Sequence, residues 1–204
     1  MRIVESNFKF LAELKDREKT THLVLHHVAW VNCTAEDIHR IHIKERKWYG
    51  IGYHFFVAKD GKIHTGRPIE KQGAHCEGCN HYSVGIAFEG DFTKEIMQQT
   101  QINAGKELIQ MIKDIYPDII IKQHKDMPNQ STLCAGEFFP FKELIKTDII
   151  FTDIKDHWCE EDIKMAQKLG LIVGYPDGTF KPDKPITRAE TISIMTKLYN
   201  KLKK

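Results

Sequence analysis

The chain has 204 residues, enough for one sizeable hydrophobic core or for one core and a small second domain. Its 30 basic and 28 acidic residues leave a formal net charge of +2, which argues against a nucleic-acid-binding protein. The sequence has no apolar run of about 20 residues, so we expect no membrane insertion. Its first 20 residues lack the apolar stretch of a secretory signal, and we expect a protein made in the cytoplasm.

The histidines are unevenly distributed along the chain, and the cysteines are odd in number. Ten of the 11 histidines precede residue 125, which suggests that polar chemistry is concentrated in the first three quarters of the chain. The five cysteines make a disulfide framework unlikely, because their number is odd and no export signal is seen. Cys76 and Cys79 form a C-x-x-C without a second pair to complete a zinc ribbon. We interpret it as chance proximity in a loop, with a reversible disulfide as the alternative.

The first elements are a strand, a helix and a hairpin. Residues 22–27 form an apolar strand, and Thr34 is the candidate N-cap of a surface helix with Ile38, Ile41 and Glu45 on one side. In "GYHFFVAKDGKIHTG", the pair at positions 60 and 61, Asp-Gly, supplies the positive φ angles of a tight turn between two strands.

A strand, a long helix and a further strand follow. "SVGIAFEG" is the strand, and residues 94–116 form an amphipathic helix with Thr93 before it and Pro117 behind it. "DIIIKQH" is expected to be a buried strand that places His124 at its carboxyl end, where open α/β sheets bind ligands. A loop and a short helix complete an α/β domain over residues 1–148.

The pattern changes near residue 149, where we place a domain boundary. Trp158, Ile163, Ala166 and Leu169 have helical spacing before a glycine, and "YPDGTF" contains a Pro-Asp-Gly turn. The T-x-x-E of "ITRAE" has the spacing of a capping box that opens a second helix. Residues 149–204 are therefore expected to form a small helix-loop-helix domain.

The adjacent histidines of "LVLHHVAW" raise the question of a metal site. Successive strand residues point to opposite faces, so His26 and His27 cannot both face one metal ion. His26 shares a face with Val24, and His27 shares one with Leu23 and Leu25. The alternation does not decide which histidine faces a ligand.

Four motifs in order, "THLVLHHVAW", "GIGYHFFVAKDGKIHTGRP", "GAHCEGCNHYSVGIAFEGDF" and "QHKDMPNQSTLC", resemble the type 2 N-acetylmuramoyl-L-alanine amidases, which include T7 lysozyme-like endolysins and peptidoglycan recognition proteins. The resemblance spans residues 5–146 and implies a mixed β-sheet flanked by helices. Matched position by position, it implies that His26, His124 and Cys134 bind Zn²⁺ and leave one position open. The alternative is a core histidine, a surface histidine and a buried thiol with no common role.

The resemblance implies hydrolysis of the amide between N-acetylmuramic acid and L-alanine of peptidoglycan. Zinc would polarise the scissile carbonyl and lower the pKa of bound water toward ~7. Tyr53 matches the family's catalytic tyrosine, with a core aromatic beside Phe55 and Val57 as the alternative. Thr132 matches an oxyanion-binding position, with a loop-capping threonine as the alternative.

Weaker matches concern the substrate and the base. His75, Asn80 and Arg67 fall where the family lines its substrate groove, although an arginine after a strand is more often a surface ion-pair partner. Some relatives have a glutamate where this chain has Ala87, and Glu89 is not assigned that role. The general base is therefore left unassigned.

Residues 151–202 resemble one S-layer homology module, which implies binding of secondary cell-wall polysaccharide. Arg188, at a helix N-terminus, would be the principal anion contact, together with Trp158 and Asp177. The alternative for Arg188 is an ordinary surface arginine. Because such modules commonly work in threes, a single module suggests self-association.

Together these features favour a phage or prophage endolysin of a Gram-positive host, released to the wall by a holin. Two other classes are kept: a peptidoglycan-recognition protein that binds without cutting, and a structural protein associated with an S-layer. Bound zinc would discriminate against the first. Export and repeated modules would be expected of the second.

Overall fold

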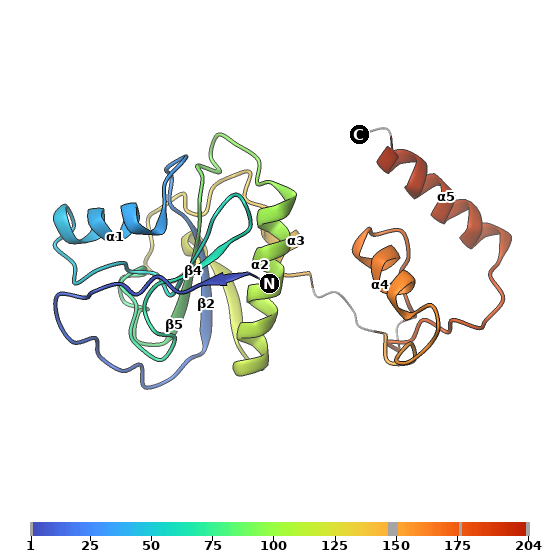
Figure 1. Cartoon of the computed structure of the whole chain (residues 1–204), viewed down its shortest axis with the longest axis horizontal. Coiled ribbons are helices and arrows are strands. Elements are labelled where there is room, and N and C mark those ends of the chain that lie inside the picture. Colours follow the sequence, from blue (N-terminus) through green and yellow to red (C-terminus); the bar gives the residue numbers. More distant parts are fainter. Residues whose placement is uncertain (1, 147–150, 176, 203–204) are drawn as a thin grey trace. The chain divides into compact units, whose positions relative to one another are not determined.

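The computed structural model describes residues 2–146, 151–175 and 177–202. The chain divides into two compact units, Met1–Lys146 and Thr147–Lys204, here called the N-terminal unit and the C-terminal unit (Figure 1). The expected domain boundary between residues 148 and 149 lies outside the described residues.

The N-terminal unit is built on a mixed six-stranded sheet with the order β1-β4-β3-β5-β2-β6. Its strands are β1 (Ile3–Val4), β2 (His22–His27), β3 (Phe55–Val57), β4 (Ile63–Thr65), β5 (Ser83–Phe88) and β6 (Ile120–Gln123). Only β3 and β4 pair antiparallel among these strands; the other neighbours are parallel. The predicted mixed sheet is confirmed, whereas the two-residue β1 was not predicted.

Helices cover both faces of this sheet. They are α1 (Ala35–Lys44), α2 (Gln99–Ile115), the 3-10 turn η1 (His124–Asp126) and α3 (Phe141–Leu144). Leu23 and Leu25 of β2 belong to the same core cluster as Leu108 of α2. Ala87 of β5 belongs to a separate cluster with Ile38 of α1. Alternate strand residues therefore face α2 on one side and α1 on the other.

Local signals located α1 correctly, but its buried face differs from the prediction. Thr34 and Asp37 form a complete capping box at the helix start. The buried positions are Ala35, Ile38 and His42, whereas Glu45 is exposed. The apolar pattern of the sequence did not reveal this buried face, because one of its residues, His42, is polar.

The β3–β4 hairpin is confirmed, with a different turn from the one expected. The positive φ falls on Gly61 (+80°) and not on Asp60. The amide of Gly61 donates to the carbonyl of Ala58 at 2.9 Å. A four-residue turn over residues 58–61 that ends on a left-handed glycine replaces the two-residue turn that the Asp-Gly pair suggested.

Two predictions about these elements were wrong, one about where a helix begins and one about whether a strand is buried. Helix α2 begins at Gln99 and not at residue 94. The residues after Asp91 form a separate turn, in which the amides of Lys94 and Glu95 donate to the carbonyl of Asp91 (2.9 and 3.0 Å). The strand expected to be buried, β6, lies at the edge of the sheet, and its Ile120 is 49% exposed. An edge strand has a neighbour on one side only, so its apolar run does not imply burial.

The C-terminal unit contains α4 (Glu160–Lys168) and α5 (Arg188–Leu202), as expected of a helix-loop-helix domain. Gly170 (φ +65°) ends α4, and the amide of Leu171 donates to the carbonyl of Ala166. Thr187 and Glu190 form the predicted capping box of α5. Trp158 was expected on the first helix, but it precedes α4 and is 87% exposed. Residue 176, the proline of the expected turn, lies outside the described residues.

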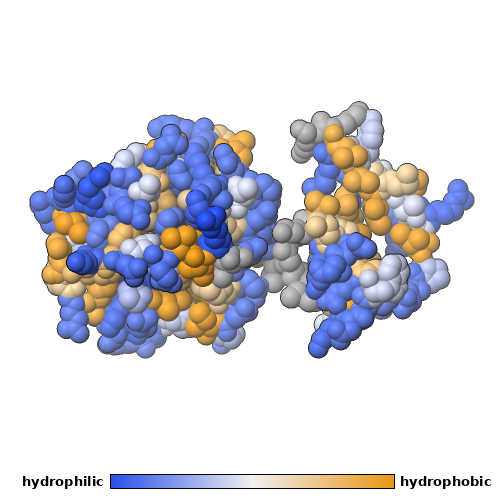
Figure 2. All heavy atoms as spheres, in the orientation of Figure 1, coloured by the Kyte–Doolittle hydropathy of each residue, from blue (hydrophilic) through white to orange (hydrophobic). Residues whose placement is uncertain are grey.

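The apolar side chains of the C-terminal unit are divided between a small core and an exposed helix. Phe151, Ile154 and Ile163 form the core. Helix α5 buries none of its described residues, and apolar side chains gather along it in Figure 2. Nowhere in residues 2–146, 151–175 and 177–202 is a helix long and apolar enough to cross a membrane.

Candidate metal centre and active site

The position of α2 decides the question raised by the adjacent histidines. His27 lies on the α2 side of β2, where its Nδ1 accepts a hydrogen bond from the amide of Phe92 (3.1 Å). His26 points to the other side and is 1% exposed. In the sheet register His26 lies beside Ala87 of β5. His26 is therefore the histidine available to a site on that face.

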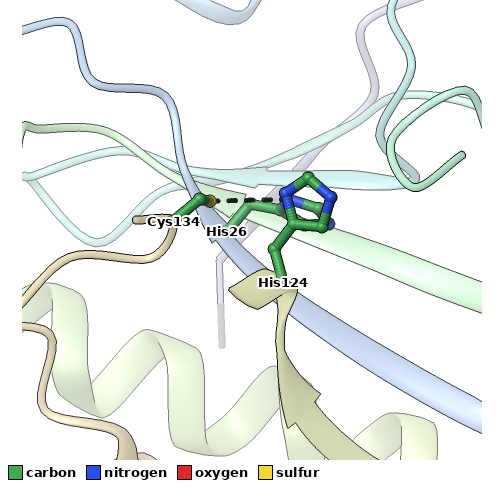
Figure 3. A group of neighbouring side chains, drawn as sticks. All are labelled: His26, His124 and Cys134. Atoms are coloured by element: carbon green, nitrogen blue, oxygen red, sulfur yellow. Dashed lines mark hydrogen bonds between the residues drawn. The ribbon is translucent and has the colours of Figure 1, made fainter. Parts of the chain in front are cut away.

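His26, His124 and Cys134 come together at one end of the sheet. One potential ligand atom from each lies within 4.8 Å of the others. Figure 3 shows His26 on β2, His124 at the end of β6 and Cys134 on the following loop. Nδ1 of His26 is 3.7 Å from Sγ of Cys134. The alternative in which these three residues have unrelated positions is not supported by this geometry.

The donor set and its spacing fit a zinc ion. Zinc bound at 2.0–2.1 Å to nitrogen and about 2.3 Å to sulfur in a tetrahedron separates those ligand atoms by about 3.6 Å. The separation of 3.7 Å between His26 and Cys134 is close to this value. Two imidazoles and one thiolate fill three positions and leave one for water or substrate.

The protonation states of the trio follow from burial. Burial, with the neighbouring histidines, holds the pKa of His26 well below its usual value. Burial also lowers the pKa of His124, so both rings are neutral, as metal ligands must be. Burial raises the pKa of the Cys134 thiol to about 12. A metal ion must therefore displace a proton from Cys134 when it binds.

Tyr53 lies next to the trio. Its ring centroid is 5.2 Å from that of His26, and it packs against the cluster that contains Ile38 of α1. Phe55 and Val57 belong to the cluster on the opposite face, so the alternative of a core aromatic beside them is wrong. Burial raises the pKa of Tyr53, which keeps the hydroxyl protonated and able to donate a hydrogen bond.

Thr132 acts as a loop cap in the structure. Its Oγ1 accepts a hydrogen bond from the amide of Cys134 at 3.2 Å. A hydroxyl that accepts one hydrogen bond still has its own O–H to donate. The observed capping contact is thus compatible with the predicted oxyanion contact, which stays a prediction.

His75 and Asn80 lie close to the trio, in a structural arrangement of their own. Nδ1 of His75 is 3.1 Å from Nε2 of His26, and the His75 ring is buried. Oδ1 of Asn80 accepts hydrogen bonds from the amides of His75 (2.8 Å) and Cys76 (3.0 Å). Substrate contact by these two residues stays a prediction.

Arg67 is buried and supports the main chain. Its Nε donates to the carbonyl of Ile51 (2.8 Å), and a terminal nitrogen donates to the carbonyl of Gln72 (2.7 Å). Burial lowers the pKa of Arg67 to about 10. The alternative of a surface ion-pair arginine is wrong, and contact with a stem-peptide carboxylate stays a prediction.

Comparison with known proteins identifies the family. Residues 16–137 match the N-acetylmuramoyl-L-alanine amidase family, and residues 150–192 match the S-layer homology domain. The chain belongs to the N-acetylmuramoyl-L-alanine amidase family. It is accordingly an enzyme, a peptidoglycan amidase with a C-terminal S-layer homology domain.

Two similar solved structures are endolysins. The endolysin N-acetylmuramoyl-L-alanine amidase LysCS from Clostridium intestinale is 38% identical, with a TM-score of 0.67, over 70% of this chain and 92% of that chain. The Ph2119 endolysin of a Thermus scotoductus bacteriophage is 27% identical, with a TM-score of 0.63, over 70% of this chain and 96% of that chain.

Curated relatives include peptidoglycan-recognition proteins. Peptidoglycan-recognition protein 2 of Holotrichia diomphalia is 34% identical over 130 residues, which are 57% of this chain and 70% of the relative. The chain spans about half the length of other such relatives, for example 52% of peptidoglycan-recognition protein SC1a of Drosophila melanogaster, to which it is 28% identical.

Two residues beside this amidase site were not found from the sequence. Gln130 lies next to His124, with Oε1 2.9 Å from Nε2 of the ring. His42 lies beside Tyr53, with ring centroids 5.6 Å apart. Glutamine in a loop and histidine on a helix carry no sequence signal for these contacts, which depend on the fold alone.

The preferred interpretation of the C-x-x-C was wrong. Cys76 and Cys79 form a disulfide bond in the structure, which was the alternative. Cys33, Cys134 and Cys159 are free thiols. Counting cysteines over the whole chain did not reveal a bond that closes only one loop.

The position at which some relatives have a glutamate is occupied here by the methyl group of Ala87. Ala87 lies beside His26 in the sheet and is fully buried. Glu89, two residues later, accepts a hydrogen bond from the amide of Lys59 (2.8 Å). This contact gives Glu89 a structural role, consistent with leaving it unassigned as a base.

The C-terminal unit has a cavity of about 450 Å³ whose lining includes Tyr175, Lys184 and Lys197. Nζ of Lys184 donates to the hydroxyl of Tyr175 at 3.0 Å. The three predicted polymer contacts are absent from the described lining: Arg188 is exposed at the start of α5, Trp158 is exposed before α4, and Asp177 accepts hydrogen bonds from the amide and hydroxyl of Thr179. These residues are not gathered around the cavity, and their binding roles stay predictions.

Proposed function

We propose that this amidase uses zinc and acts as a phage or prophage endolysin of a Gram-positive host. The observation that carries the proposal is the convergence of His26, His124 and Cys134, with ligand atoms within 4.8 Å of one another. The similarity to two endolysin structures supports the biological setting. In this setting the chain is made in the cytoplasm and reaches the wall after holin-type release.

The proposed reaction is hydrolysis of the amide between the lactyl group of N-acetylmuramic acid and L-alanine. A bound zinc ion supplies a Lewis acid that polarises a carbonyl and acidifies water. The protonated hydroxyl of Tyr53, next to His26, donates to the oxygen that gains negative charge in the transition state. The O–H of Thr132 is a second donor on the Cys134 loop, weaker than a cation at that position would be.

The experiment that tests the enzyme is mass spectrometry of peptidoglycan after digestion with the purified protein. The expected products are glycan chains with unsubstituted lactyl groups and stem peptides with a free L-alanine N-terminus. A Cys134→Ala variant should not release these products. Dialysis of the parent protein against a chelator should abolish their release. Products that persist without metal would refute the zinc mechanism.

The second candidate is a peptidoglycan-recognition protein that binds without cutting. The similarity to peptidoglycan-recognition protein 2 favours this candidate. The same digestion separates the two functions, because a recognition protein would sediment with the walls and release no fragments. The potential zinc thiol, Cys134, favours cutting over recognition.

For the C-terminal unit we propose binding of secondary cell-wall polysaccharide through residues 151–202. The S-layer homology match and the cavity lined by Lys184 and Lys197 support this proposal. Co-sedimentation of the full chain with walls, before and after chemical removal of the polysaccharide, tests it. Arg188→Ala should weaken binding if the predicted contact holds, and Lys184→Ala should weaken it if the polymer enters the cavity.

Self-association of the C-terminal unit is the last part of the proposal. Helix α5 leaves Ile192, Met195 and Leu198 exposed, and an apolar helix face is commonly covered by a partner. Sedimentation-equilibrium measurements on the full chain, with a Met195→Lys variant as control, should show association that the variant loses. A parent protein that stays monomeric at all concentrations would contradict this part.

A further inference from the structure

The ring nitrogens of His26 and His124 that face away from Cys134 both have partners. Nε2 of His26 is 3.1 Å from Nδ1 of His75, and the contact is buried. Nε2 of His124 is 2.9 Å from Oε1 of Gln130. Each ring therefore keeps Nδ1 as the nitrogen available to a cation.

The orientation of the Gln130 amide is determined by its other contacts. Its Nε2 donates to the carbonyls of Glu77 (2.9 Å) and Pro128 (3.1 Å). A side-chain amide with its nitrogen committed to two carbonyls must present its oxygen to His124. An amide oxygen only accepts, so it selects the ring tautomer with hydrogen on Nε2 and a free lone pair on Nδ1.

Both partners are held by one short segment, residues 75–80, here called the 75–80 loop. His75 is its first residue, and the carbonyl of Glu77 anchors Gln130. The Cys76–Cys79 disulfide closes the loop, and both cysteines are buried in a cluster with Val24. One loop thus contacts His26 directly through His75 and supports His124 indirectly through Gln130.

We propose that Gln130 and His75 are positioning residues, with the 75–80 loop as their common support. Gln130 sets the tautomer and ring orientation of His124, and His75 holds the ring orientation of His26. The inference rests on the proposed zinc site. A metal on Nδ1 of each histidine leaves a proton on Nε2, which donates to Oε1 of Gln130 or to Nδ1 of His75. Outer hydrogen bonds of this kind restrict the rotation of the ligand rings and raise their basicity.

The test is a titration of the full chain with Zn²⁺ against a chromogenic chelator, which reads metal affinity without using activity. Gln130→Ala and His75→Ala should each weaken zinc binding by about 10- to 100-fold, the range for lost outer partners of metal ligands. Gln123→Ala is the matched control, because Gln123 adjoins His124 in sequence but its amide contacts Asp126.

Conservative variants separate positioning from loop stability. Gln130→Glu keeps an acceptor for His124 but cannot donate to the carbonyls of Glu77 and Pro128. His75→Asn keeps an acceptor, since Oδ1 of asparagine replaces Nδ1 of histidine. Both should bind zinc more tightly than the matching alanine variants if the accepted hydrogen bond is what matters. Gln130→Glu should still bind less tightly than the parent protein, because it loses its anchor to the 75–80 loop.

Three results would overturn the inference. Alanine variants with the affinity of the parent would show that the contacts do not support the ligands. Glu and Asn variants as weak as the alanine variants would assign the residues to loop stability alone. A parent chain that binds no zinc would overturn the inference and the zinc mechanism together, whereas the first two results leave that mechanism standing.

Discussion

The two units of the chain differ in what they bury. The N-terminal unit encloses polar groups: His26, His54 and His75 are all buried in it. The C-terminal unit does the reverse, because α5 exposes Ile192 and Leu198 and buries none of its described residues. An enzyme site needs groups held in a dry, rigid setting, whereas exposed apolar groups suit contact with a partner.

This comparison predicts that chemistry and wall binding can be separated. Cys134→Ala removes a potential ligand from the N-terminal unit, and amidase turnover should fall by about 10³-fold, the scale expected when a group acting at the reacting atoms is lost. Cys159→Ala changes a free thiol in the C-terminal unit and is the matched control. Release of dye-labelled wall fragments measures turnover, and co-sedimentation measures binding. A Cys134→Ala variant that loses wall binding as strongly as it loses turnover would contradict the separation.

Core truncations should affect the units unequally. Leu108→Ala empties a fully buried site between α2 and the sheet and should lower the free energy of unfolding by about 3 kcal/mol. Leu198→Ala changes a side chain that is 43% exposed and should cost about 0.5 kcal/mol or less. Urea unfolding followed by circular dichroism measures both. A large cost at Leu198 would show that α5 is covered in the full protein.

The buried histidines predict that the N-terminal unit loses stability in acid. Burial lowers the pKa of His54 to about 3 and, with nearby arginines, that of His42 to about 4, against about 6.5 in an unfolded chain. Below pH ~6.5 the unfolded chain binds more protons than the folded chain. The free energy of unfolding therefore decreases as the pH is lowered, by up to about 1.4 kcal/mol per pH unit for each histidine.

Urea midpoints at pH 7, 6 and 5 measure this slope. His42→Gln removes one titrating group. It should reduce the dependence of the unfolding free energy on pH by close to about 1.4 kcal/mol per pH unit between pH 6 and 5, the value for one proton. The other buried histidines, among them His54, should preserve the remainder of the slope. An identical slope in the variant would mean that His42 titrates normally in the folded protein.

The smallest effects concern the two capping boxes, which are locally alike. Thr34→Ala and Thr187→Ala each remove a hydroxyl that accepts an amide hydrogen bond, and each should cost about 1 kcal/mol. Helix α1 is also held by Ile38 in the core, so its helix content should persist. Helix α5 lacks such an anchor among its described residues, and the Thr187 variant should lose helical ellipticity and amide protection there. The same response in both helices would contradict the comparison.

Local sequence was sufficient for features that depend on neighbouring residues. The capping boxes at Thr34 and Thr187, the β3–β4 hairpin and the left-handed glycine after α4 are all short-range, because backbone geometry and nearby hydrogen bonds specify them. The four family motifs, which occur in order along the chain, also identified His26, His124 and Cys134, the three residues that come together in the structure. A motif can do so because it carries a family's three-dimensional arrangement in its spacing.

Only the tertiary structure decided the remaining features. The placement of α2 separates the roles of His26 and His27, and the edge position of β6 leaves its apolar run only partly buried, with Ile120 exposed. Gln130 becomes the partner of His124 because its amide is anchored to a loop more than 50 residues away in sequence. His26 and Cys134 are themselves 108 positions apart. Strand alternation and helix periodicity extend only over single elements, so they cannot specify contacts that form when distant elements pack together.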